Sequence, residues 1–298
     1  MLYNRVNIEK GRNMMRSIKL YANAKINLFL DIESKRDDGY HNIVSLMQSV
    51  GLNDVITVSF EKSEEKIIEV SVNDPKIPTN EKNIAYKAAD KLIDKGKVRI
   101  EILKSIPSPA GLAGGSADAA AVIYALKAFG CTRASDEEII RLAASIGADV
   151  PFCLVGGSKR ITGIGDVIEN IPDVPDMDLV IALDGEGVST PVAYRMLDDK
   201  YRNFESYSVK RFDFERFSSQ NVYNVFEEVV LDLRLCAKAL KEKMYALGAS
   251  SALMSGSGPA IVGIFDSYES AESCAEAIRS SGAFAVACKT VKKGIIEA

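Results

Sequence analysis

The sequence predicts an α+β protein, in which strands and helices alternate irregularly along the chain. Short strand hairpins open the chain, and helices and single strands follow in mixed order. A regular alternation of strand and helix would instead indicate a doubly wound parallel sheet. The chain has 298 residues, 47% of them hydrophobic, which is enough for two domains with sizeable cores.

The first half of the chain begins with strands. Strand-like composition and periodicity occur in three segments, 20–31, 54–60 and 66–72. A helix is expected over 83–95, and the alternation of Val98–Leu103 predicts a half-buried strand. Ala117–Phe129 is rich in alanine and predicts a buried helix, because no Gly or Pro interrupts it. Ser135–Glu138 forms a capping box, which predicts a helix to about residue 146.

The second half mixes strands and helices. Strands are expected over 178–183, 252–254, 260–265 and 284–289. Helices are expected over 222–230, 233–247 and 268–280. Thr190 followed by Pro191 predicts the start of a further helix, with Thr190 as the N-cap and Pro191 at the first helical position.

Composition and charge restrict the class of protein. The net charge of −4 and the lack of a Lys/Arg run argue against a nucleic-acid partner. No stretch approaches the roughly 20 apolar residues that cross a membrane, and no secretory signal opens the chain. The five scattered cysteines predict reduced core thiols of a cytoplasmic protein, and a single His makes a zinc site unexpected. Residues 1–16 are expected to form a disordered extension.

A glycine-rich loop between a predicted strand and a predicted helix is the most informative segment. Gly111, Gly114 and Gly115 allow the backbone to approach another group closely, and the loop delivers free N–H groups to a helix N-terminus. The segment lacks the Gly-Lys-Ser/Thr end of a Walker A loop and the glycine spacing of a dinucleotide fingerprint. The residues alone leave two interpretations open, a phosphate site and a tight turn before a packed helix.

Pro107–Ala119 resembles the second motif of the GHMP kinases, the superfamily of galacto-, homoserine, mevalonate and phosphomevalonate kinases. Four further segments, in order and at family-like spacing, resemble the branch that phosphorylates a cytidine diphosphate-linked polyol: Ala24–Leu28, Asp38–His41, Gly147–Phe152 and Ser255–Gly258. The resemblance covers about residues 17–289. It implies an N-terminal domain like domain 2 of ribosomal protein S5 over 17–171 and a ferredoxin-like C-terminal domain over 172–298.

The same resemblance implies an ATP- and Mg²⁺-dependent kinase that is a monomer or a homodimer and has no nucleic-acid or membrane partner. Three alternatives were weighed: a related kinase for another small alcohol, an inactive sensor on the same fold, and an S5-like RNA-binding module. The presence of both Lys25 and Asp149 argues against a sensor, and the net charge argues against RNA.

The resemblance assigns catalysis to Lys25 and Asp149. Asp149 would accept the substrate's hydroxyl proton, or align the substrate, and Lys25 would pair with it and approach the same hydroxyl. Pro151 is expected to stop the chain from re-entering a helix after Asp149. The structural alternatives are a turn carboxylate for Asp149 and an edge-strand gatekeeper for Lys25.

The resemblance assigns the β- and γ-phosphates of ATP to the glycine-rich loop. The residues concerned are Pro107, Ser108, Pro109, Ala110, Gly111, Leu112, Ala113, Gly114, Gly115, Ser116 and Ala117. Pro109 and Ala117 depart from the family pattern by removing an N–H and a hydroxyl, and Ala113, where Gly is frequent, is expected to be a milder change. Asn83 and Lys104 take the family positions of a purine pocket, with a helix N-cap and a solvated strand end as their alternatives.

The resemblance also assigns the substrate pocket. Its residues are Asn27, Tyr40, His41, Thr190, Tyr194, Gly256 and Ser257. Tyr40 and Tyr194 are expected to stack on the two faces of the cytosine, and His41 and nearby backbone groups to read its edge. The structural alternatives are a turn aromatic for Tyr40, a core helix residue for Tyr194 and a plain connector for 255–258.

Overall fold

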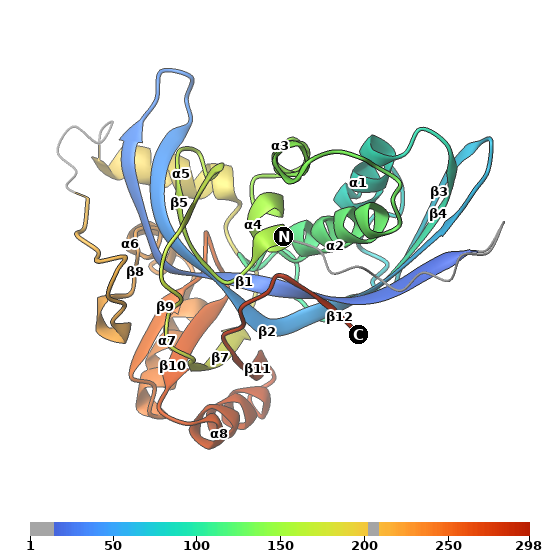
Figure 1. Ribbon diagram of the computed structural model, residues 1–298. Helices are drawn as coiled ribbons and strands as arrows, with labels where there is room; N and C mark the ends of the chain where they lie inside the picture. Colours follow the sequence, from blue (N-terminus) through green and yellow to red (C-terminus); the bar gives the residue numbers. More distant parts are fainter. Residues whose placement is uncertain (1–14, 202–208) are drawn as a thin grey trace.

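A computed structural model describes residues 15–201 and 209–298, which form two sheets with helices packed against them (Figure 1). The strands are β1 (Arg16–Lys35), β2 (His41–Glu61), β3 (Lys66–Val72), β4 (Gly96–Leu103), β5 (Ser158–Thr162), β6 (Val167–Asn170), β7 (Asp178–Leu183), β8 (Tyr223–Asn224), β9 (Ser251–Met254), β10 (Ile261–Phe265), β11 (Phe284–Lys289) and β12 (Ile295–Glu297). The α-helices are α1 (Ile84–Leu92), α2 (Gly114–Ala128), α3 (Asp136–Ala144), α4 (Val150–Val155), α5 (Thr190–Tyr201), α6 (Glu227–Val230), α7 (Leu235–Ala246) and α8 (Tyr268–Arg279).

The first sheet is built on the long antiparallel pair of β1 and β2. Its order is β12-β1-β2-β4-β3, and β5 and β8 join it at the sides. The sequence predicts only parts of this pair, 20–31 of β1 and 54–60 of β2, and it does not show the register shifts, for example between Asn23 and Ala24. Gly51 and Asn53, residues typical of turns, interrupt the apolar pattern although β2 continues through them. Helices α1–α4 lie together on one side of the pair (Figure 1).

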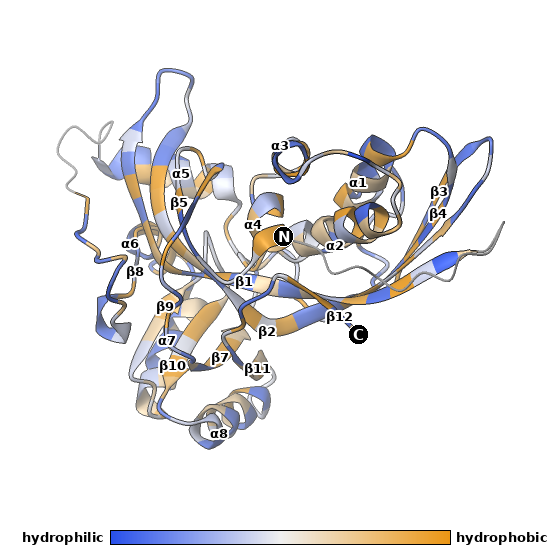
Figure 2. Cartoon of the chain, viewed as in Figure 1, coloured by the Kyte–Doolittle hydropathy of each residue, from blue (hydrophilic) through white to orange (hydrophobic). Residues whose placement is uncertain are grey.

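The second sheet has the order β11-β7-β10-β9, and every pairing in it is antiparallel. With α7 between β7 and β9 and α8 between β10 and β11, this is the order of a ferredoxin-like domain, as the sequence predicts. Both helices pack against the sheet. In Figure 2 the strands of the interior are mainly orange and the outer side of α8 is mainly blue, the amphipathic pattern of a helix that covers a core.

Several expected boundaries differ from the structure. The helix expected over 222–230 is wrong, because β8 occupies its start and only α6 is helical. The buried Asn224 explains this: its amide donates to the carbonyls of Met254 and Gly256, and its oxygen accepts from the N–H of Phe226. These bonds hold the backbone away from a helix.

Two helix ends also differ from the expectation. Helix α1 stops at Leu92, because Ile93 is extended. The carbonyl of Ser189, not Thr190, accepts the first N–H bonds of α5, so Thr190 is already helical.

One core joins the two sheets. It includes Leu20 and Ile56 of the first sheet and Ile181 and Val262 of the second. Two short strands from late in the chain, β8 and β12, pair with β1. Because both sheets share this close-packed core, β1 and the segments that contact it are held in fixed positions relative to one another.

Three further expectations concern the N-terminal extension, the cysteines and membrane-spanning helices. Arg16 already belongs to β1, so the expected extension does not reach residue 16, and residues 1–14 lie outside the described part. All five cysteines are free, but Cys236 is exposed and is not the core thiol that was expected. Within 15–201 and 209–298, no helix is long and apolar enough to span a membrane.

Candidate active site

One cavity of about 530 Å³ brings together residues from distant parts of the sequence. It lies where β1, β2, α5 and the loop between β9 and β10 meet, beside the segment that leads into α4. Both catalytic candidates and all seven substrate candidates line it: Lys25, Asp149, Asn27, Tyr40, His41, Thr190, Tyr194, Gly256 and Ser257. Five separate motifs therefore converge on one concave surface.

Lys25 is buried in the interior of the first sheet, with its side chain 5% exposed. Its ammonium donates to the Asn27 side-chain oxygen at 2.7 Å and lies 4.0 Å from the nearer Asp149 carboxylate oxygen. Asn27 in turn donates to the hydroxyl of Ser45. A buried ammonium does not act as an edge gatekeeper, so this alternative for Lys25 is wrong. The arrangement is that of an oriented cation beside a carboxylate.

Asp149 stands at the N-cap position of α4, yet its side chain makes no capping hydrogen bond. One third of the carboxylate is exposed, on the cavity side. Pro151 does not stop a helix here, because α4 begins at Val150 and proline is tolerated in a first turn. Helix α4 therefore fixes the backbone of Asp149 while the carboxylate stays available to a bound molecule.

The glycine-rich loop ends in the N-terminus of α2. The first N–H group that bonds within this helix is that of Ala117, which donates to the carbonyl of Ala113. The N–H groups before Ala117 are therefore not used within the helix. Ala113 has φ 57°, the only positive φ of a non-glycine residue in the described chain. Alanine is strained in this region, so the residue has a backbone cost that the sequence does not reveal, while its effect on phosphate binding stays a prediction. The start of α2 therefore presents free N–H groups, the arrangement that binds anions at helix N-termini.

The loop between β9 and β10 packs directly on the glycine-rich loop. The Ser255 hydroxyl donates to the carbonyl of Gly111, and a Cβ added to Gly111 would lie 2.1 Å from the carbonyl oxygen of Ser255. A Cβ added to Gly256 would lie 3.7 Å from the Lys25 ammonium. Only glycine fits at the 2.1 Å approach of position 111, whereas 3.7 Å at position 256 is an ordinary van der Waals distance. The 255–258 loop is therefore more than a connector, because it joins the phosphate-loop candidate to Lys25.

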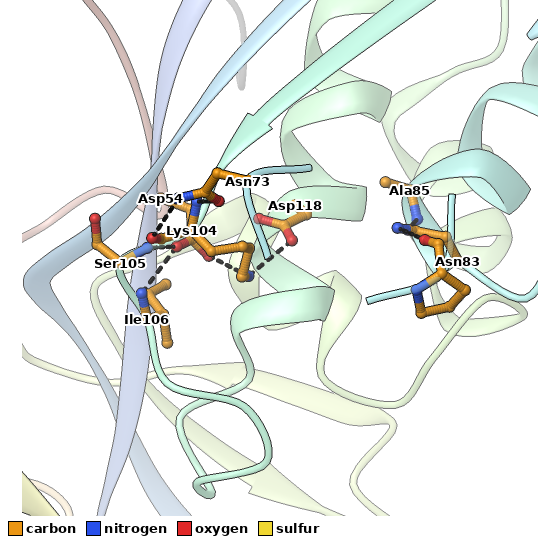
Figure 3. Close-up of polar contacts among 9 residues, drawn as sticks. Asp54, Asn73, Asn83, Ala85, Lys104, Ser105, Ile106 and Asp118 are labelled. Carbon is orange, nitrogen blue, oxygen red and sulfur yellow. Dashed lines mark hydrogen bonds and ion pairs between the residues drawn. The ribbon is translucent and has the colours of Figure 1, made fainter. Parts of the chain in front are cut away.

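Lys104 lies between two carboxylates (Figure 3). Its ammonium contacts Asp54 and lies 2.8 Å from Asp118, with side-chain exposures of 6%, 0% and 5% for the three residues. Burial raises the pKa of the Asp118 carboxyl well above its usual range, although the Lys104 ammonium opposes the shift. The interpretation of Lys104 as a solvated strand end is wrong, and a purine contact by it stays a prediction.

The same cluster fixes the start of the loop. The second oxygen of Asp54 accepts the N–H groups of Ser105 and Ile106. A Cβ added to Gly114 would lie 3.1 Å from the Lys104 ammonium, so the cluster touches the first residue of α2. Asn83 acts as the N-cap of α1: its oxygen accepts from the N–H of Ala85, and its amide donates to the carbonyl of Pro78 (Figure 3). A purine contact by Asn83 also stays a prediction.

The cavity also contains the aromatic candidates Tyr40, His41 and Tyr194, here called the base subsite. Tyr40 is 61% exposed, whereas the rings of His41 and Tyr194 are stacked at 4.6 Å with an interplanar angle of 17°. Burial raises the pKa of Tyr194 to about 12, so its hydroxyl stays neutral. One face of Tyr194 is thus covered by His41, which the sequence does not reveal.

Two functional candidates were missed by the sequence reasoning. Asp198 follows Tyr194 by one helical turn, lines the cavity and contacts His41; the i, i+4 spacing on α5 is the signal that would have found it. Asp118 stands in an otherwise apolar run of alanines, and a buried carboxylate in such a helix indicates a partner.

The described residues contain no group of three or more His, Cys, Asp or Glu side chains that could hold a metal ion. A magnesium ion needs only one or two protein oxygens beside substrate phosphates. The Asp149 carboxylate and the Ser116 hydroxyl are oxygen-bearing side chains of this region, and a Cβ added to Gly147, two residues before Asp149, would lie 3.9 Å from the Ser116 hydroxyl.

Comparison with known proteins adds an independent line of observation. The description "GHMP kinases N terminal domain" matches residues 83–157, and "GHMP kinases C terminal" matches residues 212–283. A 4-diphosphocytidyl-2-C-methyl-D-erythritol kinase of Thermoanaerobacter pseudethanolicus is 38% identical over 94% of this chain and 99% of its own length. A relative of the same name from Caldicellulosiruptor saccharolyticus is 43% identical over 83% of this chain and 87% of its own length.

Solved structures agree with these matches. A crystal structure of 4-(cytidine 5'-diphospho)-2C-methyl-D-erythritol kinase superposes with a TM-score of 0.74 and 29% identity, over 93% of this chain and 99% of that one. A homoserine kinase from Cytophaga hutchinsonii superposes with a TM-score of 0.66 and 18% identity, over 98% of this chain and 100% of that one. The second likeness concerns the fold alone.

Proposed function

The chain belongs to the 4-diphosphocytidyl-2-C-methyl-D-erythritol kinases of the GHMP kinase superfamily, and from this premise we propose how its cavity performs the reaction. The chain is an ATP-dependent small-molecule kinase of the non-mevalonate isoprenoid pathway. We assign the phosphoryl acceptor to the 2-hydroxyl of the polyol, beside Lys25 and Asp149. The observation that carries the assignment is the position of this pair, between the glycine-rich loop and the cavity.

The phosphate end of the reaction is assigned to the glycine-rich loop and the first turn of α2. The N–H groups before Ala117 and the positive end of the helix dipole bind the β- and γ-phosphates. ATP supplies the phosphoryl group, and Mg²⁺, for which Ser116 and Asp149 offer oxygens, neutralises the phosphate charge. Pro109 has no N–H group, so this loop has one hydrogen-bond donor fewer than the family pattern. The N–H groups of Gly114 and Gly115 therefore make the larger part of the phosphate contacts.

The acceptor end is assigned to Asp149 and Lys25. The carboxylate accepts the hydroxyl proton at its exposed oxygen as the oxygen–phosphorus bond forms. Lys25, held by Asn27, lies beside the carboxylate and places a positive charge where negative charge develops. Because phosphoryl transfer has a loose transition state, alignment of the hydroxyl is as much a part of the role of Asp149 as proton acceptance.

The other end of the substrate is assigned to the base subsite. Tyr40 is exposed and offers a stacking face for the cytosine, and the His41–Tyr194 pair forms the opposite wall. Thr190 and Ser257, whose hydroxyls lie 3.0 Å apart, line the same cavity and offer hydrogen bonds to the substrate. A cavity of about 530 Å³ is of the size that small-molecule substrates occupy.

The test is ADP release by the purified protein with MgATP and 4-diphosphocytidyl-2-C-methyl-D-erythritol, with homoserine and mevalonate in parallel. Turnover of the cytidylyl substrate alone is expected. Equal turnover of another alcohol would refute the assignment of the base subsite. The phosphorylated position is read by phosphorus–carbon coupling in the NMR spectrum of the product, and transfer to a hydroxyl other than the 2-hydroxyl would refute the placement beside Asp149.

A further inference from the structure

Asp198 connects the β1–β2 hairpin to α5 behind the His41–Tyr194 wall of the base subsite. It lies on α5, one turn after Tyr194, with its side chain 18% exposed. One carboxylate oxygen lies 2.7 Å from the His41 ring nitrogen Nε2, and the other lies 2.7 Å from the Lys35 ammonium. His41 and Lys35 are paired across β1 and β2, so a single carboxylate ties the end of this hairpin to α5.

The contacts of Asp198 determine which ring nitrogen of His41 carries a hydrogen. Partial burial raises the pKa of the Asp198 carboxyl, but the hydrogen bonds from Lys35 and His41 outweigh it, and the pKa lies below its usual value. Asp198 is therefore ionised at neutral pH, and an ionised carboxylate can only accept hydrogen bonds. The Nε2 nitrogen of His41 must therefore be the donor, and in the neutral imidazole this leaves Nδ1 as the acceptor.

The orientation of the imidazole is fixed as well. The His41 side chain is 4% exposed and lies between the Asp198 carboxylate and the face of Tyr194. Tyr194 is held in turn by an edge contact with Phe226, with ring centroids 5.0 Å apart. A ring restrained at its edge by a charge-assisted hydrogen bond and on its face by a stacked aromatic has one orientation.

From these contacts we propose that Asp198 is a positioning residue that makes the base subsite selective for cytosine over uracil. The proposal rests on the proposed function, in which His41 and the backbone around it read the edge of the base. Cytosine and uracil present opposite hydrogen-bond patterns at position 4, an amino donor in one and a carbonyl acceptor in the other. An imidazole held in one tautomer offers one fixed pattern, and a subsite with a fixed pattern discriminates between the two bases.

An amide in place of the carboxylate gives the sharpest variant. In Asp198→Asn the amide oxygen faces Lys35, because an ammonium cannot accept a hydrogen bond, and the amide NH₂ then faces His41. The NH₂ group requires Nε2 to be an acceptor, which holds the imidazole in the opposite tautomer. The shape of the side chain is unchanged, so a purely structural role of Asp198 would survive this substitution and a tautomer-setting role would not.

The experiment measures binding of cytidine diphosphate and uridine diphosphate by calorimetry, with the nucleotide site filled by a non-hydrolysable ATP analogue. The ratio of the two dissociation constants is expected to fall about tenfold in Asp198→Asn, the value of roughly one hydrogen bond. Asp199→Asn is the matched control, because it makes the same change of charge on the adjacent, exposed residue of α5 and is expected to keep the ratio.

A second variant, Asp198→Ala, removes the restraint altogether. It is expected to lower the selectivity ratio as well and to raise KM for the cytidylyl substrate about tenfold while kcat and KM for ATP change by less than about threefold. An unchanged ratio in a folded Asp198→Asn protein would overturn the role of Asp198. Because the ratio is measured without turnover, failure of the wild-type protein to phosphorylate the cytidylyl substrate is a separate result that refutes the proposed function itself.

Discussion

Replacing Lys104 with methionine tests the energetic role of the buried charge cluster behind the glycine-rich loop. Methionine keeps the approximate length of the side chain and removes the only ammonium that contacts Asp54 and Asp118 in the described structure. Both carboxylates stay buried, since their side chains are at most 5% exposed. The loop start at Ser105 and Ile106 and the first residue of α2 are attached to the same cluster.

The magnitude follows from what each carboxylate retains. Asp54 still accepts two backbone N–H groups, so its desolvation remains partly compensated. Asp118 has a buried oxygen with no hydrogen-bond partner even in the wild-type protein, and its pKa is already raised well above the usual range by burial. Asp118 can therefore take up a proton instead of remaining an unpaired charge. Breaking a buried pair costs about 3–5 kcal/mol, and this relief places the expected loss near the lower end, about 3 kcal/mol.

The assay is urea unfolding followed by circular dichroism, with Lys97→Met as the matched control. Lys97 lies on β4, and its ion pair with Glu69 is partly exposed, so the control is expected to lose less than about 1 kcal/mol. A loss in Lys104→Met no greater than that in Lys97→Met would refute the reasoning, because it would mean that the cluster contributes no more than a surface pair. In the folded fraction of Lys104→Met, KM for ATP is expected to rise more than KM for the cytidylyl substrate.

Three further predictions follow from the same geometry. Asp149→Asn and Lys25→Met are each expected to lower kcat about 10²–10⁴-fold while equilibrium dialysis still shows ATP binding, and a kcat within twofold of wild type, a change of less than about 0.5 kcal/mol, would exclude the residue from the mechanism. Ala113→Gly is expected to stabilise the protein by about 0.5–1 kcal/mol in urea unfolding, because glycine adopts φ 57° without strain; a loss of stability would contradict this. The raised pKa of Asp118 means that the folded state binds more protons than the unfolded state, so stability is lost as pH rises above the usual carboxyl pKa; Asp118→Asn is expected to flatten that loss in a pH series of unfolding curves, and an equally steep loss would contradict it.

The elements that the sequence predicts well are those whose signal is local. Strand β7 and the capping box of α3 match because a short apolar run and a Ser–Glu pair each lie within a few neighbouring residues. The short strands β8 and β12 are missed because they exist only through pairing with β1. Their residues carry no pattern of their own, so tertiary contacts decide their conformation.

The candidate site shows the same division. The motifs around Lys25 and Asp149 identify which residues meet, since each motif is a short run with unusual composition. The motifs do not show which polar side chains contact one another. Asp54 and Asp118, for example, lie 50 and 14 residues from Lys104 in the sequence, and both contact its ammonium only in the folded chain. Asp198 is missed for a related reason, since its contact with His41 spans 157 residues.

These shared atoms indicate why both sheets are needed for one chemical step. The acceptor pair lies on β1 and at the start of α4, the phosphate cradle lies at the start of α2, and the loop from the second sheet seals them at Gly111. The Ser255 hydroxyl donates to the Gly111 carbonyl and also accepts, at 3.3 Å, the N–H of Asn27, the residue that holds the Lys25 ammonium. One side chain of the C-terminal sheet thus fixes both the phosphate loop and the acceptor strand. Because in-line transfer depends on the separation of these two groups, we propose that the contact at Ser255 sets the distance over which the phosphoryl group moves.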